Sequence, residues 1–271
     1  MWGCVTTRST EGEDARRYAE ERQQLITRTA HRDGRVSVSR LAAELEVASE
    51  TIRRDLEILD RRGILRRVHG GAVPAESLRL VEVDVPERAA THVAEKERIA
   101  RAALAHLPVG GGAVILDGGT TAAQLAALLP ADPALTVITN SVPAAVALAA
   151  RAVMPVYLLG GRLRGVTQAT VGNEAQSLLG RTRVDVTFLG TNGITAAHGL
   201  STPDPDEAGT KRAMVAAARR VVALADSSKF GQEHLVSFAR AEDVDVIITD
   251  TGVPDADRAA LEALDVEVVV A

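Results

Sequence analysis

The chain has few of the residues that support disulfides, metal sites or membrane insertion. Its single cysteine, Cys4, excludes an internal disulfide framework and a cysteine-based metal site. The six histidines are scattered, with no close pair at metal-ligand spacing, so we expect no metal and no cofactor. No segment reaches the roughly 18 consecutive apolar residues of a membrane-spanning helix, and residues 1–14 lack the apolar run of a secretory signal. These absences predict a protein of the reducing cytoplasm with no membrane partner.

Nucleotide-binding motifs and aromatic residues are also scarce. The chain has no Gly-x-x-x-x-Gly-Lys-Ser/Thr loop, and the glycine run at 110–112 does not continue into a dinucleotide fingerprint. This argues against a nucleotide-dependent enzyme. One Trp, two Tyr and three Phe offer little for single-stranded bases to stack on. If the protein binds nucleic acid, duplex DNA is the better candidate.

The segment 49–59 predicts a helix built to contact nucleic acid. Ile52, Leu56 and Leu59 fall at i, i+4 and i+7, so they form one apolar face. Ser49 is the expected N-cap, because its hydroxyl can accept from an unpaired N–H of the first turn. The side chains of Thr51, Arg53 and Arg54 project away from this apolar face. They lie near the N-terminal end of the helix, where a recognition helix meets base edges.

Neighbouring segments complete a small domain. Residues 36–45 predict a second amphipathic helix, and the tight turn after it makes the pair a helix-turn-helix. A helix over about 15–29 adds Leu25 and Ile26 to the same core. Residues 63–73 are rich in β-branched and apolar residues and contain paired glycines, which predicts a wing whose arginines contact phosphates. The candidate DNA-contacting residues are Ser39, Ser49, Thr51, Arg53, Arg54, Arg66, Arg67 and His69.

The charge distribution favours DNA binding over an ordinary solvated helix. The arginines could instead pair with Glu50, Asp55 and Glu57 along the helix surface. However, residues 16–73 hold 13 Lys and Arg against 9 Asp and Glu, a net of +4, whereas the remainder holds 18 against 27, a net of −9. The basic charge is therefore concentrated where the helices are, as expected for a DNA-binding surface.

The rest of the chain alternates strand-like and helical segments. Strands are predicted at 113–116, 135–139, 155–159, 184–189, 221–225, 244–249 and 266–270, with alanine-rich helices between most of them. This pattern predicts a buried, mostly parallel sheet in an α/β domain. We expect a disordered lead-in at 1–14, a winged helix-turn-helix domain at 15–73, a linker at 74–86 and the larger α/β domain at 87–271.

The chain resembles the DeoR family of bacterial transcriptional regulators over nearly all of its length. The residues that carry this resemblance are 51–56 (TIRRDL), 67–72 (RVHGGA), 116–121 (LDGGTT), 139–141 (TNS), 159–161 (LGG), 188–190 (FLG) and 226–229 (DSSK). The resemblance implies an effector domain similar in fold to ribose-5-phosphate isomerase and coenzyme A transferases. It also implies a phosphorylated sugar as effector and operators in genes of carbohydrate catabolism as targets.

Small polar residues follow the predicted strands, where open α/β sheets bind ligands. The segment 118–121 opens a helix, so its backbone N–H groups and the helix N-terminus suit a phosphate, whereas Asp117 suits sugar hydroxyls. The residues expected at the strand ends are Asp117, Gly118, Gly119, Thr120, Thr121, Thr139, Asn140, Gly160, Gly161, Arg162, Gly190, Thr191 and Asn192. A glycine after a strand is usually turn chemistry, but convergence of four strand ends predicts a pocket.

Two lysines are the charged candidates for this pocket. Lys229 follows a strand end, and Lys211 lies on a later helix; an ammonium group can neutralise a phosphate, although most lysines only keep a surface soluble. The family's pattern places an acidic residue four positions before the helical lysine, which Glu207 matches. The same spacing also fits a simple salt bridge on the helix surface.

The sequence predicts a DNA-binding transcriptional regulator rather than an enzyme. We expect a repressor of carbohydrate-catabolism genes that binds a double-stranded operator under the control of a phosphorylated sugar, as a symmetric homo-oligomer, dimer or tetramer. Two alternatives stay open. One is a sugar-phosphate isomerase-like enzyme, with an acid–base residue among Asp117, Asp206, Glu207 and Asp226; the other is a DNA-binding scaffold whose second domain only oligomerises. A shared fold does not carry a shared activity.

Overall fold

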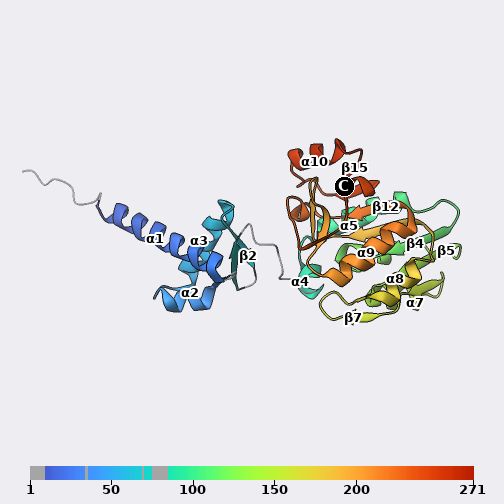
Figure 1. The fold of residues 1–271 in the computed structure, drawn as a ribbon, viewed down its shortest axis with the longest axis horizontal. Coiled ribbons are helices and arrows are strands. Elements are labelled where there is room, and N and C mark those ends of the chain that lie inside the picture. The colour runs from blue at the N-terminus through green and yellow to red at the C-terminus, as the bar shows by residue number, and fades with distance from the viewer. Residues whose placement is uncertain (1–9, 34–35, 69, 75–84) are drawn as a thin grey trace, which may run out of the picture. The chain divides into compact units, whose positions relative to one another are not determined.

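The chain folds into two compact units, residues 1–77 and 78–271. The computed structural model describes residues 10–33, 36–68, 70–74 and 85–271 (Figure 1). Each unit has its own hydrophobic core. The division between the units falls inside the segment 74–86, in which Pro74 ends a strand and Val85 begins a helix.

The described residues of the N-terminal unit form three helices and a small antiparallel sheet. Its helices are α1 (Thr10–Asp33), α2 (Val38–Glu44) and α3 (Ser49–Arg61), and its sheet has the order β1 (Val36–Ser37), β3 (Gly71–Pro74), β2 (Leu65–Val68). Ile52, Leu56 and Leu59 are buried against Ile26 and Leu65, as the i, i+4, i+7 spacing predicts. The unit is therefore a winged helix-turn-helix.

Helix α1 differs from the prediction at both ends and in its buried face. It begins at Thr10, inside the segment 1–14 predicted to be disordered; residues 1–9 lie outside the described residues. Leu25 is 46% exposed and does not join the core, because the buried stripe follows Ile26 and Ala30 at i, i+4.

Two details of the helix-turn-helix also differ from the prediction. Val36 and Ser37 do not begin a helix; they form β1 and pair with β3. Helix α2 begins after Ser37, because the Ser37 side chain caps it by accepting from the Arg40 N–H. Ser49 is not an N-cap: it is the first helical residue, and the capping position is held by Ala48, which has no side-chain acceptor.

A buried carboxylate fixes α3 against α1. Asp55 accepts from Arg22 Nε at 2.5 Å and from Gln23 Nε2 at 2.9 Å, and it is 3% exposed. Asp55 is therefore turned into the domain and does not neutralise the arginines on the outer face of α3, as the alternative interpretation of this helix had required.

The C-terminal unit is built on a seven-stranded sheet in which every pairing is parallel. The strand order is β15 (Glu267–Val270), β14 (Val246–Thr249), β12 (Ala218–Leu224), β9 (Val184–Gly190), β4 (Gly112–Leu116), β5 (Leu135–Thr139), β6 (Val156–Leu158). Each of these strands lies at one of the predicted strand positions. Their β-branched, apolar sequences fit a sheet that is covered on both faces.

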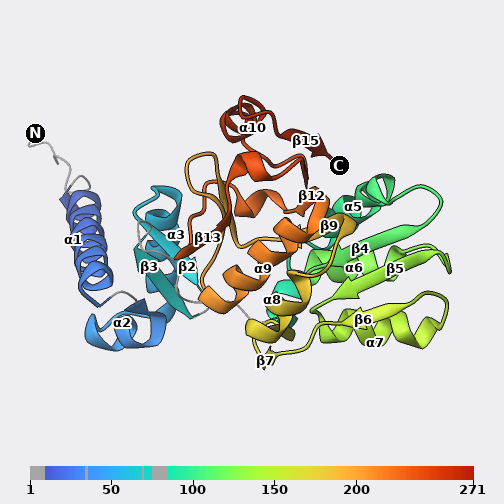
Figure 2. The same cartoon turned by 45° about the vertical axis from the view of Figure 1, so that its right-hand side comes forward.

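Helices cover both faces of this sheet (Figure 2). One core cluster includes α5 (Val93–Ala103), α6 (Thr120–Leu128) and α7 (Val142–Arg151), and the other includes α8 (Asn173–Leu179), α9 (Pro205–Ala217) and α10 (Asp255–Glu262). The short helix α4 (Val85–Ala90) precedes α5. No helix among the described residues is long and apolar enough to cross a bilayer.

In the described part of the C-terminal unit, five short strands lie outside the main sheet and were not predicted from the sequence. They are β7 (Arg162–Arg164), β8 (Ala169–Val171), β10 (Gly193–Thr195), β11 (Gly199–Thr202) and β13 (Val236–Ala239). Segments this short carry too few residues for a clear period-2 pattern. They form two small antiparallel sheets, β7-β8 and β10-β11-β13.

The order of the strands reverses between β4 and β9. From β4 the chain proceeds outward to β5 and β6 at one edge, and it then returns to β9 on the other side of β4 and continues to β15 at the opposite edge. The connections at such a switch point diverge and leave a crevice at the carboxyl ends of the two strands. The topology therefore places a ligand site beside β4 and β9.

Candidate functional site

A cavity lies at the carboxyl ends of the central strands of the C-terminal unit. It encloses about 700 Å³ when its open mouth is included. Residues that line it are Arg88, Thr91, Lys96, Asp117, Gly118, Gly119, Thr120, Thr121, Asn140, Thr167, Gly190, Thr191, Asn192, Glu207, Lys211, Asp226 and Lys229. Within the described part of the chain, no group of three or more His, Cys, Asp or Glu side chains is placed to hold a metal ion.

The structure brings most of the predicted pocket residues together and leaves out four. Gly160 and Gly161 are exposed and do not line the cavity, because β6 is the edge strand and the chain after it turns away into β7. Thr139 is fully buried, and its Oγ1 accepts from the Ser141 N–H at 3.0 Å. It holds the turn from β5 into α7. Arg162 is also outside the cavity and pairs with Asp206 at 2.6 Å.

The N-terminus of α6 forms one wall of the cavity. Gly119 precedes the helix with φ 141°, a conformation that favours glycine, and Gly118 lies so close to Ala169 that an added Cβ would approach its Cβ to 2.8 Å. The first N–H groups of a helix have no intrahelical acceptor and carry partial positive charge. This wall can therefore bind an anion, with the Thr120 and Thr121 hydroxyls beside it.

A buried ion pair forms the floor of the site. Lys211 donates to Asp117 Oδ2 and, at 3.0 Å, to the Gly190 carbonyl, and its Nζ lies 5.4 Å from the centroid of the Phe238 ring. The same Asp117 oxygen accepts from the Gly190 N–H at 3.0 Å. Burial raises the pKa of Asp117 above its ordinary value, and the ammonium of Lys211 opposes that rise. The charge of Lys211 is thus largely offset within the protein.

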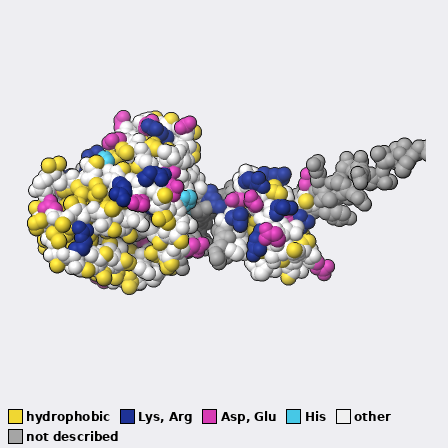
Figure 3. All heavy atoms as spheres, turned by 180° about the vertical axis from the view of Figure 1, so that it is seen from behind, with side chains coloured by type: hydrophobic (Ala, Val, Ile, Leu, Met, Phe, Trp, Pro, Cys, Tyr) yellow, Lys and Arg dark blue, Asp and Glu magenta, His cyan; other side chains and the backbone are white. Residues whose placement is uncertain are grey.

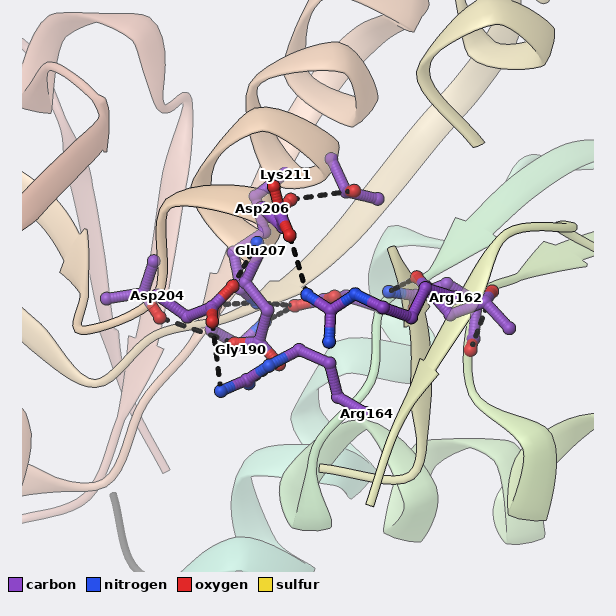
Figure 4. A network of polar contacts seen from close by, with 12 residues as sticks. Arg162, Arg164, Gly190, Asp204, Asp206, Glu207 and Lys211 are labelled. Carbon is purple, nitrogen blue, oxygen red and sulfur yellow. Dashed lines mark hydrogen bonds and ion pairs between the residues drawn. The ribbon is translucent and has the colours of Figure 1, made fainter. Parts of the chain in front are cut away.

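Glu207 joins this network from one turn earlier on α9 (Figure 4). It accepts from Arg164 Nη1 at 2.6 Å and from Thr202 Oγ1 at 3.3 Å. Burial opposes its ionisation, but Lys211, Thr167 and Arg164 together hold its pKa below the ordinary value. Glu207 and Lys211 are 6% and 5% exposed, so the alternative of a salt bridge on the helix surface is wrong.

Thr167, which precedes β8, lines the cavity and was not predicted. Nor were three residues around α4 and α5: Arg88 on α4, Thr91 between the two helices and Lys96 on α5. Lys96 is 4% exposed, and its ammonium donates to the backbone carbonyls of Arg88 and, at 2.7 Å, of Thr91. Burial lowers its pKa. No motif or spacing singles these three residues out, because they reach the cavity only through the packing of α4 and α5.

The outer face of α3 carries exposed arginines in the N-terminal unit. Arg53 forms an exposed ion pair with Glu50 at 3.1 Å, whereas no described side chain forms an ion pair with Arg54. On the wing, Arg67 is exposed and Arg66 is half-buried. Ser39 and Ser49 are exposed and Thr51 is half-buried, while His69 lies outside the described residues. On the face drawn in Figure 3, basic side chains gather on this unit among acidic ones.

A winged helix-turn-helix with outward arginines, in one chain with a parallel α/β domain that holds a polar, cation-lined cavity, defines a ligand-sensing transcriptional regulator. The comparisons with known proteins agree with this class. Residues 22–77 match the DeoR-like helix-turn-helix domain, and residues 91–251 match the DeoR C terminal sensor domain. The chain therefore belongs to the DeoR family.

Two relatives align over most of their length. The HTH-type transcriptional regulator GlpR of Haloferax volcanii is 40% identical over 252 residues, which cover 93% of this chain and 97% of that protein. The glycerol-3-phosphate regulon repressor of Escherichia coli K12 is 33% identical over 235 residues, covering 86% and 92%. Among solved structures, ribose 5 phosphate isomerase A from Neisseria gonorrhoeae aligns with a TM-score of 0.37 and 16% identity, over 51% of this chain and 53% of that one.

Proposed function

We propose that this protein is a repressor of carbohydrate-catabolism genes whose affinity for a duplex operator is controlled by a phosphorylated sugar. The observation that carries the proposal is the cavity at the switch point of the sheet, where a helix N-terminus and cationic side chains meet uncharged hydrogen-bonding groups. A repressor acts on DNA, so we expect it in the cytoplasm. The name of the E. coli relative, a repressor of a glycerol-3-phosphate regulon, supports a phosphorylated effector.

The two ends of the cavity suit the two parts of such a ligand. The phosphate is assigned to the N-terminus of α6, with Lys229 nearby as a further charge. The sugar is assigned to the polar floor, where Asn140 donates to the Thr170 carbonyl at 3.3 Å while its Oδ1 is buried without a partner. An unpartnered buried acceptor suits a sugar hydroxyl, since burying it unpaired is unfavourable.

The ion pair in the floor favours a sensor over an enzyme. An isomerase needs a free acid–base group within reach of the exchanging proton. The carboxylate of Asp117 is already bonded to Lys211 and to the Gly190 N–H, and that of Glu207 to Arg164. We therefore infer that these groups position hydroxyls rather than transfer protons.

Operator binding is expected to depend on the ligand. Titrating the full chain onto its duplex operator in the presence of a panel of phosphorylated sugars should reveal at least one that weakens binding by about 5–150-fold, the usual range for coupling between two sites. Fluorescence anisotropy measures this, with the matching unphosphorylated sugars as controls. If no sugar phosphate changes operator affinity or thermal stability, the sensing role is wrong and the scaffold alternative gains. Exchange of solvent protons into a bound sugar phosphate would favour the enzyme.

The chain is expected to form a symmetric dimer or tetramer, because paired half-sites mirror the symmetry of the protein that binds them. The edge strand β6 supports this, since Tyr157 and Leu158 are 58% and 47% exposed there. Leu158→Glu should lower the mass measured by light scattering, whereas Leu178→Glu on α8 should not. A monomeric wild-type protein would contradict the oligomer; an unchanged mass of Leu158→Glu would place the interface elsewhere.

A further inference from the structure

Arg88 is a cation in the cavity wall with two side-chain nitrogens that have no described hydrogen-bond partner. It belongs to α4, and its Nε and Nη2 atoms are buried with no hydrogen-bond partner among the described residues. Buried donors are normally paired, and an unpaired one in a native structure calls for a specific explanation. A site for a ligand oxygen would supply one.

The carboxylates of the cavity do not provide that partner. Asp117 pairs with Lys211, Glu207 pairs with Arg164, and Asp226 lies 4.0 Å from the ammonium of Lys229. Lys96, the nearest buried cation in the sequence, already donates to two backbone carbonyls. A guanidinium differs from these ammonium groups because its planar fork can bind two oxygens of one phosphate.

Helix α4 is held beside the N-terminus of α6, at the cavity that Arg88 lines. The Val85 N–H donates to the Val166 carbonyl at 3.1 Å at the start of α4, and Lys96 binds the Arg88 carbonyl near its end. Val85 and Ala89 line a hollow together with Gly119 and Thr120. The helix therefore lies beside the wall that was assigned to the phosphate.

We propose that Arg88 binds the phosphate of the effector opposite the N-terminus of α6, and that this contact fixes α4 on the sensor domain when the ligand is bound. The inference rests on the proposed function and adds to it a phosphate-binding residue and the element that responds. In the chain, α4 is the first described helix after the DNA-binding unit. Ligand binding then fixes the helix with which the described part of the sensor domain begins.

The test compares inorganic phosphate binding to the full-length wild type and to three variants by calorimetric titration. Arg88→Ala should bind phosphate about 10–100-fold more weakly, the range expected for lost hydrogen bonds to a charged group. Arg88→Lys should fall between, because it keeps the charge but loses the fork. Arg101→Ala, an exposed arginine on α5 that pairs with Glu97, should bind like the wild type. If the wild type binds only sugar phosphates, the responding sugar phosphate replaces inorganic phosphate.

Two further measurements separate ligand binding from a structural role. Without phosphate, Arg88→Ala should melt at the wild-type temperature or above it, because the removed donors have no partner to lose. With phosphate, hydrogen exchange of the α4 amides should slow in the wild type and stay unchanged in Arg88→Ala.

The outcomes distinguish this inference from the proposed function. Equal phosphate affinity of Arg88→Ala and the wild type would overturn the inference while leaving the regulator intact. A lower melting temperature of ligand-free Arg88→Ala would also overturn it, in favour of a structural arginine. Weaker binding with no slowing of exchange in wild-type α4 would overturn the coupling through α4. If the wild type binds no phosphorylated compound at all, the proposed function itself fails.

Discussion

Lys211→Ala is expected to lower the free energy of unfolding of the C-terminal unit by about 3–5 kcal/mol, as found when one partner of a buried ion pair is removed. The loss is large because Lys211 compensates Asp117, whose side chain is 1% exposed, and also stabilises ionised Glu207 nearby. Without the ammonium, the negative charges of the buried Asp117 and Glu207 repel each other with no lysine to compensate them. Urea unfolding followed by circular dichroism measures the effect.

A matched variant and a double variant test the cause. Arg212→Ala, at the next position of α9, removes an exposed cation that donates to the Ser237 carbonyl, and it should cost far less. Lys211→Met combined with Asp117→Leu should recover much of the stability, because replacing a buried pair by apolar groups is often neutral. A loss below about 1 kcal/mol in Lys211→Ala would show that the pair is not desolvated as the structure indicates.

The loss of stability caused by Lys211→Ala should depend on pH in a defined direction. Burial raises the folded-state pKa of Asp117 above its ordinary value of 3.8, so its ionised form costs stability and the folded state binds the proton more tightly. Removing Lys211 raises this pKa further. The deficit of Lys211→Ala should therefore shrink as pH falls from about 8 to about 5. In the wild type, the stability that Glu207 contributes is lost as pH falls below its ordinary value of 4.5, because its folded pKa is lowered. Since Lys211 helps to lower that pKa, Glu207 also makes the deficit of Lys211→Ala shrink on acidification. A deficit that grows on acidification would contradict this assignment.

Arg54→Ala is expected to weaken operator binding by about 10–100-fold at constant salt, because one good contact to a base edge contributes about 1–3 kcal/mol. Arg54 is exposed on α3 and forms no ion pair with a described side chain, so its guanidinium is available to DNA at no cost to the protein. Arg53 must first leave Glu50 and should contribute less. Anisotropy on a duplex selected by the wild-type protein from a random library measures both.

The specificity of the Arg54 effect identifies the type of contact. If Arg54 reads a base, Arg54→Ala should relax discrimination at one position of the site; if it binds a phosphate, all sequences should weaken equally and the salt slope should fall by about one. Arg61→Ala, at the far end of α3 and 4.0 Å from Glu57, serves as the control. Unchanged affinity of Arg54→Ala would remove α3 as the recognition helix.

Local sequence patterns were sufficient to predict the strands of the main sheet, the buried face of α3 and part of the site. Seven β-branched runs correspond to the seven strands of the parallel sheet, because each buried strand must be apolar along its own length. The spacing of Ile52, Leu56 and Leu59 set which face of α3 is buried, and hence which face presents arginines. The glycines and threonines at 118–121 were found from their place between a strand and a helix.

Local sequence patterns could not predict which strand ends line the cavity, because that depends on the order of the strands in the sheet. Four strand ends were expected to converge, but the end of β6 does not, because β6 lies at the edge and only the strands around the switch point face the cavity. Whether a strand is central or lateral is not encoded in that strand alone. Gly160 and Gly161 therefore looked the same in sequence as Gly118 and Gly119.

The sequence by itself determined the strands of the main sheet, the buried face of α3 and the class of regulator, since each follows from periodicity or from short motifs along the chain. The tertiary structure alone decided which charges meet. Asp55 is held by Arg22 from 33 residues away and Asp117 by Lys211 from 94 residues away, and Arg88 faces a cavity built mostly by residues far along the chain. A carboxylate is paired, buried or free only after the chain has brought its partner to it, so no local pattern of residues contains that information.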